Sequence, residues 1–124
     1  MKIPMPGRCQ CGAISYTLNN EPLFGYACHC YNCQKRTGSA FSMGLVITLD
    51  SLELEGELVE WSRVSDEGNT NTRHSCASCG NIINGTADNS PGLAKLQNGT
   101  LADTSDVEPE VHIWTRSKQP WETL

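Results

Sequence analysis

The stretch Ala27–Ser39, ACHCYNCQKRTGS, holds the densest group of reactive side chains in the sequence. Cys28, Cys30 and Cys33 fall within six residues, and His29 lies between the first two. Three thiols cannot all be paired in disulfides, because one is always left over, but all three can bind the same metal ion. We therefore predict a three-thiolate zinc site with an open fourth position.

The remaining four cysteines form two pairs, one on each side of this stretch, with C-x-C and C-x-x-C spacing. Structural zinc sites are closed by four protein ligands, whereas catalytic sites keep three ligands and one open position. The two outer pairs make a natural four-cysteine site and leave the middle cluster as the three-ligand site, although the count alone does not prove this partition. The predicted metal ligands are Cys9, Cys11, Cys76 and Cys79 for the first site and Cys28, Cys30 and Cys33 for the second.

Length, charge and the N-terminal sequence indicate the number of domains, the cellular location and the kinds of partner to expect. The 124 residues predict a single domain, residues 1–124. The start, MKIPMPGRC, has no apolar stretch typical of a signal peptide, and no run is long enough to span a membrane, so we expect a cytoplasmic protein with reduced thiols. The net charge of −5 argues against sequence-independent binding of nucleic acid.

The pattern along the chain predicts a mainly β protein, because short β-forming stretches alternate with Gly, Pro and Asn turns. A single helical turn is expected over 31–36, ended by Gly38, and a tight metal-binding turn over Gly7–Gly12. Strands are expected over 13–18, 23–27, 41–49, 52–54, 58–64, 72–75, 82–83, 93–96 and 111–115. The three tryptophans are expected in the core or as anchors of the C-terminal tail: Trp61, Trp114 and Trp121.

Four motifs in order resemble the glutathione-dependent formaldehyde-activating enzyme family, also called the GFA or centromere-protein-V family. They are G-x-C-x-C-G at 7–12, A-C-H-C-x-x-C-x-x-x-T-G-S at 27–39, C-x-x-C-G at 76–80 and H-I-W-T-R-S-x-x-P-W at 112–121. The order and spacing together are specific, whereas a single C-x-x-C would be weak. One departure is Ser75, where similar sequences often have an aromatic residue.

The resemblance implies a zinc β-tent fold, in which short antiparallel strands in two sheets are tied by the four-cysteine zinc site. It implies two zinc ions per chain, one structural and one catalytic, the latter held by Cys28, Cys30 and Cys33. It also implies a carbon–sulfur lyase similar to S-(hydroxymethyl)glutathione synthase, which joins glutathione to formaldehyde. The expected partners are a glutathione-like thiol and an aldehyde, with no nucleic acid and no membrane, and the chain is a candidate homodimer.

Zinc held by three thiolates has a local charge of −1, so it suits thiol activation better than hydroxide formation. Lys35 and Arg36 follow the cluster and could offset its charge or bind a substrate carboxylate, or they could be solvated surface cations. His29 could orient the substrate or move a proton, although a structural role is slightly favoured. Two other histidines, His74 and His112, are expected to be structural.

Two rival functions follow from the same residues. A non-catalytic zinc module that binds a protein partner would have a closed second site, with His29 or another group as fourth ligand. A zinc-ribbon protein that binds nucleic acid is disfavoured by the negative charge. The lyase reading requires the second metal position to be open to thiols.

Overall fold

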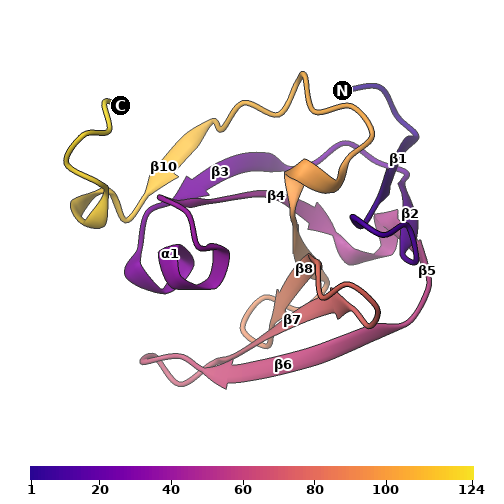
Figure 1. Cartoon of the computed structure of the whole chain (residues 1–124), viewed down its shortest axis with the longest axis horizontal. Coiled ribbons are helices and arrows are strands. Elements are labelled where there is room, and N and C mark those ends of the chain that lie inside the picture. Colours follow the sequence, from indigo (N-terminus) through magenta and orange to yellow (C-terminus); the bar gives the residue numbers. More distant parts are fainter.

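The first sheet is small and contains the N-terminal strands. The computed structural model describes all 124 residues, Met1–Leu124. Strand β1 (Met5–Arg8) pairs antiparallel with β2 (Ser15–Leu18), which pairs antiparallel with β5 (Leu52–Glu55). The side chains of β2 alternate as the sequence predicts, with Tyr16 and Leu18 buried. This three-stranded sheet lies at one end of the molecule (Figure 1).

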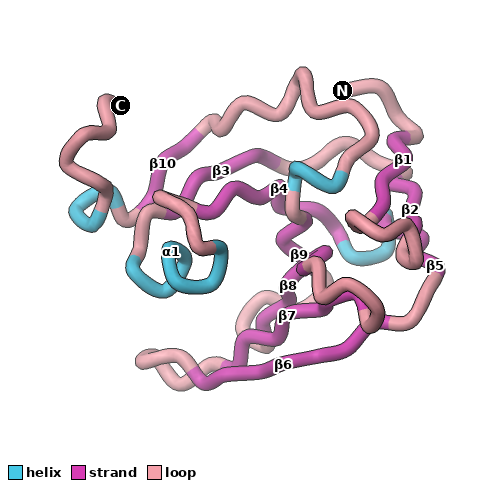
Figure 2. The backbone as a smooth tube through the Cα atoms, in the orientation of Figure 1, coloured by secondary structure: helices cyan, strands magenta, loops and turns pink.

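The second sheet has seven strands in the order β10-β3-β4-β9-β8-β7-β6. All neighbours are antiparallel except β10, which runs parallel to β3. The strands are β3 (Phe24–Cys28), β4 (Ser42–Thr48), β6 (Leu58–Val64), β7 (Thr70–Cys76), β8 (Ile82–Ala87), β9 (Leu93–Leu96) and β10 (Val111–Ile113). Figure 2 shows how strands dominate the chain and how the β6–β7 hairpin lies apart from β3 and β4.

Helical structure is confined to short segments. The α-helix α1 (Tyr31–Thr37) follows β3, and Gly38 ends it in the left-handed conformation with φ 69°. Three 3₁₀ turns complete the elements: η1 (Leu49–Ser51), η2 (Asn98–Thr100) and η3 (Thr115–Ser117). No helix in the structure combines the length and the apolar character needed to cross a membrane.

The main hydrophobic core lies between the two sheets. Thirteen buried residues form it, and they come from both sheets and from the loops that join them. Leu45 and Ile47 of β4 and Leu96 of β9 face Tyr16 and Leu18 of the small sheet. Because side chains alternate along a strand, only one face of the seven-stranded sheet is used for this packing. We call it the core face.

The opposite face of the seven-stranded sheet carries the middle cysteine cluster. Residues directly opposite each other on paired strands share a face, so Cys28 and its partner Ser42 lie on the same side as Tyr26 and Val46. We call this the thiol face. A second, smaller apolar cluster covers part of it, made of Tyr26, Cys28 and Val46.

The link between the sheets depends on Gly56. Gly56 lies between β5 and β6, which belong to different sheets. Gly56 has φ 116°, and a Cβ there would lie 2.4 Å from the Ala13 carbonyl oxygen. Only glycine fits both the backbone conformation and the close approach.

Most strand predictions are confirmed, and two differ from the structure. The predicted turn over Gly7–Gly12 begins inside a strand, because β1 runs from Met5 to Arg8 and pairs with β2. The predicted strand over 111–115 ends at Ile113, since Trp114 adopts φ 56° and is the N-cap of η3.

The three tryptophans are not in the core, which was one of the two places expected for them. Their exposed fractions are 52% for Trp61, 50% for Trp114 and 71% for Trp121. Two of the indole rings are covered by arginine side chains, as Arg73 lies 4.2 Å from the Trp61 ring and Arg116 lies 4.7 Å from the Trp114 ring.

Candidate metal centres

The two outer cysteine pairs meet where β1 leads into its turn and β7 ends. The four Sγ atoms of Cys9, Cys11, Cys76 and Cys79 all lie within 4.8 Å of one another. Two of the separations are 3.6 Å, between Cys9 and Cys11, and 3.8 Å, between Cys11 and Cys76. A tetrahedral zinc with Zn–S bonds of about 2.3 Å requires sulfur separations of about 3.8 Å. The geometry of this group therefore fits zinc.

Backbone amides around the four-cysteine group point at its sulfurs. Ile14 N–H donates to Cys9 Sγ at 3.3 Å, Ala13 N–H to Cys11 Sγ at 3.4 Å, and Ser78 N–H to Cys76 Sγ at 3.4 Å. Such bonds stabilise thiolates, which are the metal-binding form. Burial raises the pKa of Cys9, but the hydrogen bonds from Ile14 and the neighbouring groups lower it to about 6.

Because the four sulfurs lie so close together, repulsion between thiolates opposes ionisation of all four when no cation is bound. The Ala13 N–H lowers the pKa of Cys11, but the neighbouring thiols and burial together raise it to about 11. None of the seven cysteines is in a disulfide. A divalent cation would remove the repulsion between the thiolates, which is the role that the donor set suits.

The middle cluster is assembled by the end of β3 and the start of α1. Cys28 ends the strand, Cys30 is the N-cap of the helix and Cys33 lies in its first turn. The Cys33 N–H donates to Cys30 Sγ at 3.3 Å, so the cap itself orients one ligand. The three Sγ atoms lie within 4.8 Å of one another, and no histidine or carboxylate joins them.

The electrostatics of the middle cluster favour a thiolate at Cys33. A hydrogen bond from the Cys28 thiol is the main reason that the pKa of Cys33 falls to about 4, and Ser42 and Arg36 add to the effect. The same interaction raises the pKa of Cys28. Ser42 lies opposite Cys28 on β4, and its buried hydroxyl has no other partner. Like the outer group, this cluster offers soft donors suited to zinc.

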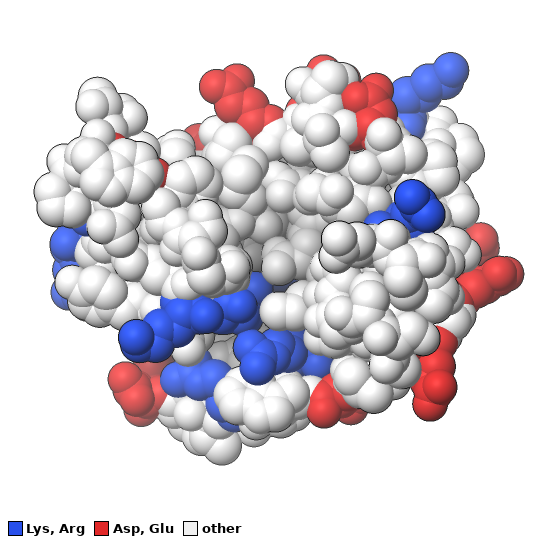
Figure 3. All heavy atoms as spheres, in the orientation of Figure 1, with Lys and Arg blue, Asp and Glu red and all other residues white.

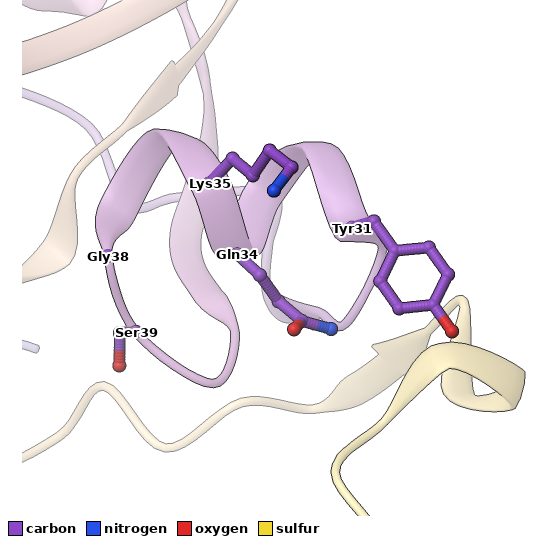
Figure 4. Close-up of a pocket in the computed structure, with 5 residues that line it drawn as sticks. All are labelled: Tyr31, Gln34, Lys35, Gly38 and Ser39. Carbon is purple, nitrogen blue, oxygen red and sulfur yellow. The ribbon is translucent and has the colours of Figure 1, made fainter.

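Helix α1 places Lys35 and Arg36, the two cations that the sequence offered as neighbours of the middle cluster, on different sides. Residues three apart share a helix face, so Arg36 lies on the side of Cys33, and its Nη2 is 3.8 Å from the Cys33 sulfur. Lys35 lies on the other side, beside a depression of about 620 Å³ that contains none of the cysteines (Figure 4). That depression is lined by Tyr31, Gln34, Lys35, Gly38 and Ser39.

His29 points away from the thiols into a network of its own. Its side chain is fully buried, with Nε2 3.0 Å from His112 Nδ1 and Nδ1 2.9 Å from Glu122 Oε2. The C-terminal tail is held further by Gln34, whose amide donates to the Ser117 carbonyl and accepts from Gln119. These contacts agree with the structural role expected for His29 and His112.

His74 is likewise engaged away from both cysteine groups. Its Nε2 lies 3.0 Å from Thr86 Oγ1, and its Nδ1 lies 3.4 Å from Glu60 Oε1. Sequence reasoning missed Ser42 and Glu122 as neighbours of the site. Ser42 lies inside the apolar run 41–49, and nothing in the local sequence marks Glu122.

Comparison with known proteins places the chain in a family. The family model for glutathione-dependent formaldehyde-activating enzyme matches residues 4–117, which include all seven cysteines. The chain belongs to this family. The family resemblance of the four motifs is thereby confirmed.

Two curated fungal relatives bear the name "Putative glutathione-dependent formaldehyde-activating enzyme". The protein of Penicillium rubens is 33% identical over 75 residues, which cover 59% of this chain and 39% of that protein. The protein of Sordaria macrospora is 33% identical over 84 residues, which cover 63% of this chain and 35% of that protein. The matched parts span less than half of the length of these relatives.

A solved structure shares the fold. A crystal structure of a Rhodobacter sphaeroides protein superposes with a TM-score of 0.66 at 18% sequence identity. The match covers 87% of this chain and 99% of the other. At this identity the likeness concerns the fold alone.

Proposed function

We propose that this GFA-family protein is a zinc-dependent carbon–sulfur lyase that joins a small thiol, glutathione in the first instance, to formaldehyde or a related aldehyde. In this proposal each chain holds two zinc ions. The structural ion is bound by the two outer cysteine pairs, and the working ion is bound by Cys28, Cys30 and Cys33. Reduced thiols in both sites suit the cytoplasm.

The observation that carries the proposal is the composition of the middle cluster. It contains three sulfurs and no fourth ligand, the pattern typical of a catalytic rather than a structural zinc site. The rival reading, a closed site in a protein-interaction module, would need His29 or another group as fourth ligand. The His29 ring instead faces away from the cluster, with Nε2 3.0 Å from His112 Nδ1 and Nδ1 2.9 Å from Glu122 Oε2, which favours the lyase.

The reaction needs no oxidant or reductant. A carbon–sulfur bond forms between the thiol sulfur and the aldehyde carbon, and the carbonyl π bond breaks. Its electron pair moves to the oxygen, which takes the thiol proton and becomes a hydroxyl. Zinc at the three thiolates would supply one thing, a lowered pKa for a fourth thiol. Two residues of the chain act around it: Arg36 offsets the negative charge beside Cys33, and the Ser42 hydroxyl stabilises the Cys33 thiolate.

The test combines a metal probe with an activity assay. Cobalt-substituted protein is titrated with glutathione and with a thiol-free control, and the visible spectrum reports a change in thiolate number at one site. Formation of S-hydroxymethylglutathione from glutathione and ¹³C-formaldehyde is then followed by exchange NMR. We expect a spectral change with glutathione only, and a catalysed rate that Cys30→Ser abolishes while the far-ultraviolet circular dichroism stays the same.

Two outcomes would count against the lyase. An unchanged cobalt spectrum at saturating glutathione would mean that the second site is closed, and the protein-interaction reading would replace the proposal. A Cys30→Ser variant that keeps the full rate would show that the cluster does not take part in the reaction.

A further inference from the structure

The thiol face carries a row of cations that leads away from the middle cysteine cluster. The strand register places Trp61, Arg73, Gly85, Lys95 and Val46 opposite one another across five neighbouring strands, β6, β7, β8, β9 and β4. These side chains therefore share one face of the sheet. Val46 in turn belongs to the apolar cluster that contains Cys28.

No acidic side chain competes on this part of the face. Alternation along β6–β9 places a set of non-acidic residues on the thiol face. They are Val59, Trp61, Arg63, Asn71, Arg73, Ser75, Gly85, Ala87, Leu93 and Lys95. Glu60 faces the other way, where it pairs with His74. The protein has a net charge of −5, yet this part of its surface is positively charged. Figure 3 shows Lys and Arg atoms gathered along the hollow between α1 and the β6–β7 hairpin, with most Asp and Glu atoms around the rim.

A gap in the side-chain layer separates the two central cations. Gly85 lies between Arg73 and Lys95 and leaves the backbone of β8 uncovered. Its φ is not in the left-handed region, and a Cβ built there would meet only the Thr72 carbonyl oxygen, at 3.6 Å. The backbone would therefore accept a side chain at this position, and glycine instead leaves room between two cations.

Arg36 connects this row to the thiols. The Gln97 amide, oriented so that its nitrogen donates to the Met43 carbonyl, accepts from Arg36 Nη1 at 3.2 Å. Gln97 follows β9 and lies two residues after Lys95, on the same face. The other end of the Arg36 guanidinium, Nη2, is 3.8 Å from Cys33 Sγ. One cation thus sits beside the thiols, and two more lie further along the face.

The spacing suits a small peptide-like thiol. Lys95 pairs with Val46, and Cys28 pairs with Ser42 four residues away on the same strand, so their Cα atoms are separated by about 13 Å along the strands and about 10 Å across them. After allowing for the length of the two side chains, roughly 8–10 Å separates the amine from the thiols. A carboxylate two or three residue lengths from a cysteine sulfur spans a comparable distance.

We propose that Arg73 and Lys95, on either side of Gly85, bind a carboxylate of the thiol substrate, and that Arg36 lies between this carboxylate and the sulfur. The protein would then select thiols that carry a remote carboxylate, such as glutathione, over neutral thiols. This selection rests on the lyase function proposed above. The guanidinium of Arg73 is positioned for it by the Trp61 ring beneath, and a bidentate contact with a carboxylate suits its planar shape.

The test measures binding of S-methylglutathione by calorimetry or NMR titration. This probe keeps both carboxylates but has no free thiol, so its binding does not depend on thiolate chemistry or on turnover. We expect Arg73→Gln and Lys95→Gln each to weaken binding about tenfold, as befits the loss of a charge-assisted hydrogen bond. Gly85→Val, which changes no charge, should weaken binding by filling the gap. The diethyl ester of S-methylglutathione should bind worse than the acid.

The matched control is Lys35→Gln, which removes a cation from the other side of α1, and it should leave binding unchanged. Equal losses for Lys35→Gln and Arg73→Gln would reduce the effect to net charge and overturn the proposal. So would unchanged binding in both the Arg73 and Lys95 variants. Absence of lyase activity with normal, charge-dependent binding of the probe would instead refute the proposed reaction and keep the carboxylate site.

Discussion

The two cysteine groups should differ sharply in how much they stabilise the fold. We compare Cys11→Ser/Cys79→Ser with Cys30→Ser/Cys33→Ser, since each double variant removes two thiolates from one group. Cys11 and Cys79 are exposed, and Cys30 and Cys33 are only half-buried, so little apolar packing is lost in either case. The difference in stability between the two variants then reports the cross-links that the proposed zinc ions would provide.

The size of the difference follows from the lengths of chain that each group closes. Cys11 and Cys76 are 65 residues apart, and a cross-link over such a loop stabilises by about 4 kcal/mol in the chain-entropy relation. The middle cluster closes only the short segment from Cys28 to Cys33, for which the same relation gives about 2 kcal/mol. For a chain of this size, about 4 °C per kcal/mol corresponds to losses of about 16 °C and 8 °C in Tm.

Thermal unfolding followed by circular dichroism, with zinc content measured on the same samples, tests this expectation. Each double variant should lose one zinc ion per chain. If the Cys11/Cys79 variant loses its ion but melts within a few degrees of the wild type, the four-cysteine group does not tie the end of β1 to the end of β7. If the variant keeps two ions, the assignment of the ligands is wrong.

Three further expectations concern the packing around the sites. Gly7→Ala should destabilise the protein, because a Cβ there would lie 2.1 Å from the Tyr16 ring; a chemical melt should show the loss, and Tyr16→Ala in the same chain should make the alanine no longer harmful. Ile47→Ala, at a fully buried core position, should cost about 2–5 kcal/mol in denaturant unfolding, and a loss under 1 kcal/mol would contradict the packing described. Glu122→Ala should remove the partner of His29 Nδ1 and raise hydrogen exchange in residues 115–124, while an unchanged exchange pattern would mean that this contact does not hold the tail.

Much of the fold could be read from the sequence because its signals are local. The strands over 41–49 and 58–64 are apolar or β-branched stretches bounded by turn residues, and both appear as strands, β4 and β6. The helical turn after Cys30 could be predicted from the glycine that ends it, Gly38. Strand β1 was missed because Pro6 and Gly7 disfavour a strand on propensity, and pairing with β2 overrides that preference.

The cysteine groups were also accessible from the sequence, while their surroundings were not. Thiol spacing and number are properties of short segments, and the fold brings together the same two sets that spacing suggested. The exposed tryptophans could not be anticipated, because burial depends on which face of a strand meets the core. Glu122 lies 93 residues from its partner His29, and no local pattern encodes a contact over that separation.

The sequence by itself determined which thiols this protein can offer to a metal ion, since thiols at C-x-C and C-x-x-C spacing can converge within one turn of chain. Only the tertiary structure decided which side chains surround those thiols. Arg36 and Lys35 are adjacent in sequence, yet the helix turns one toward Cys33 and the other away from it. Arg73 and Lys95 come together on the thiol face because strand register aligns them on either side of Gly85. Register is set by burial and pairing across the whole sheet, so it is a property of the folded chain.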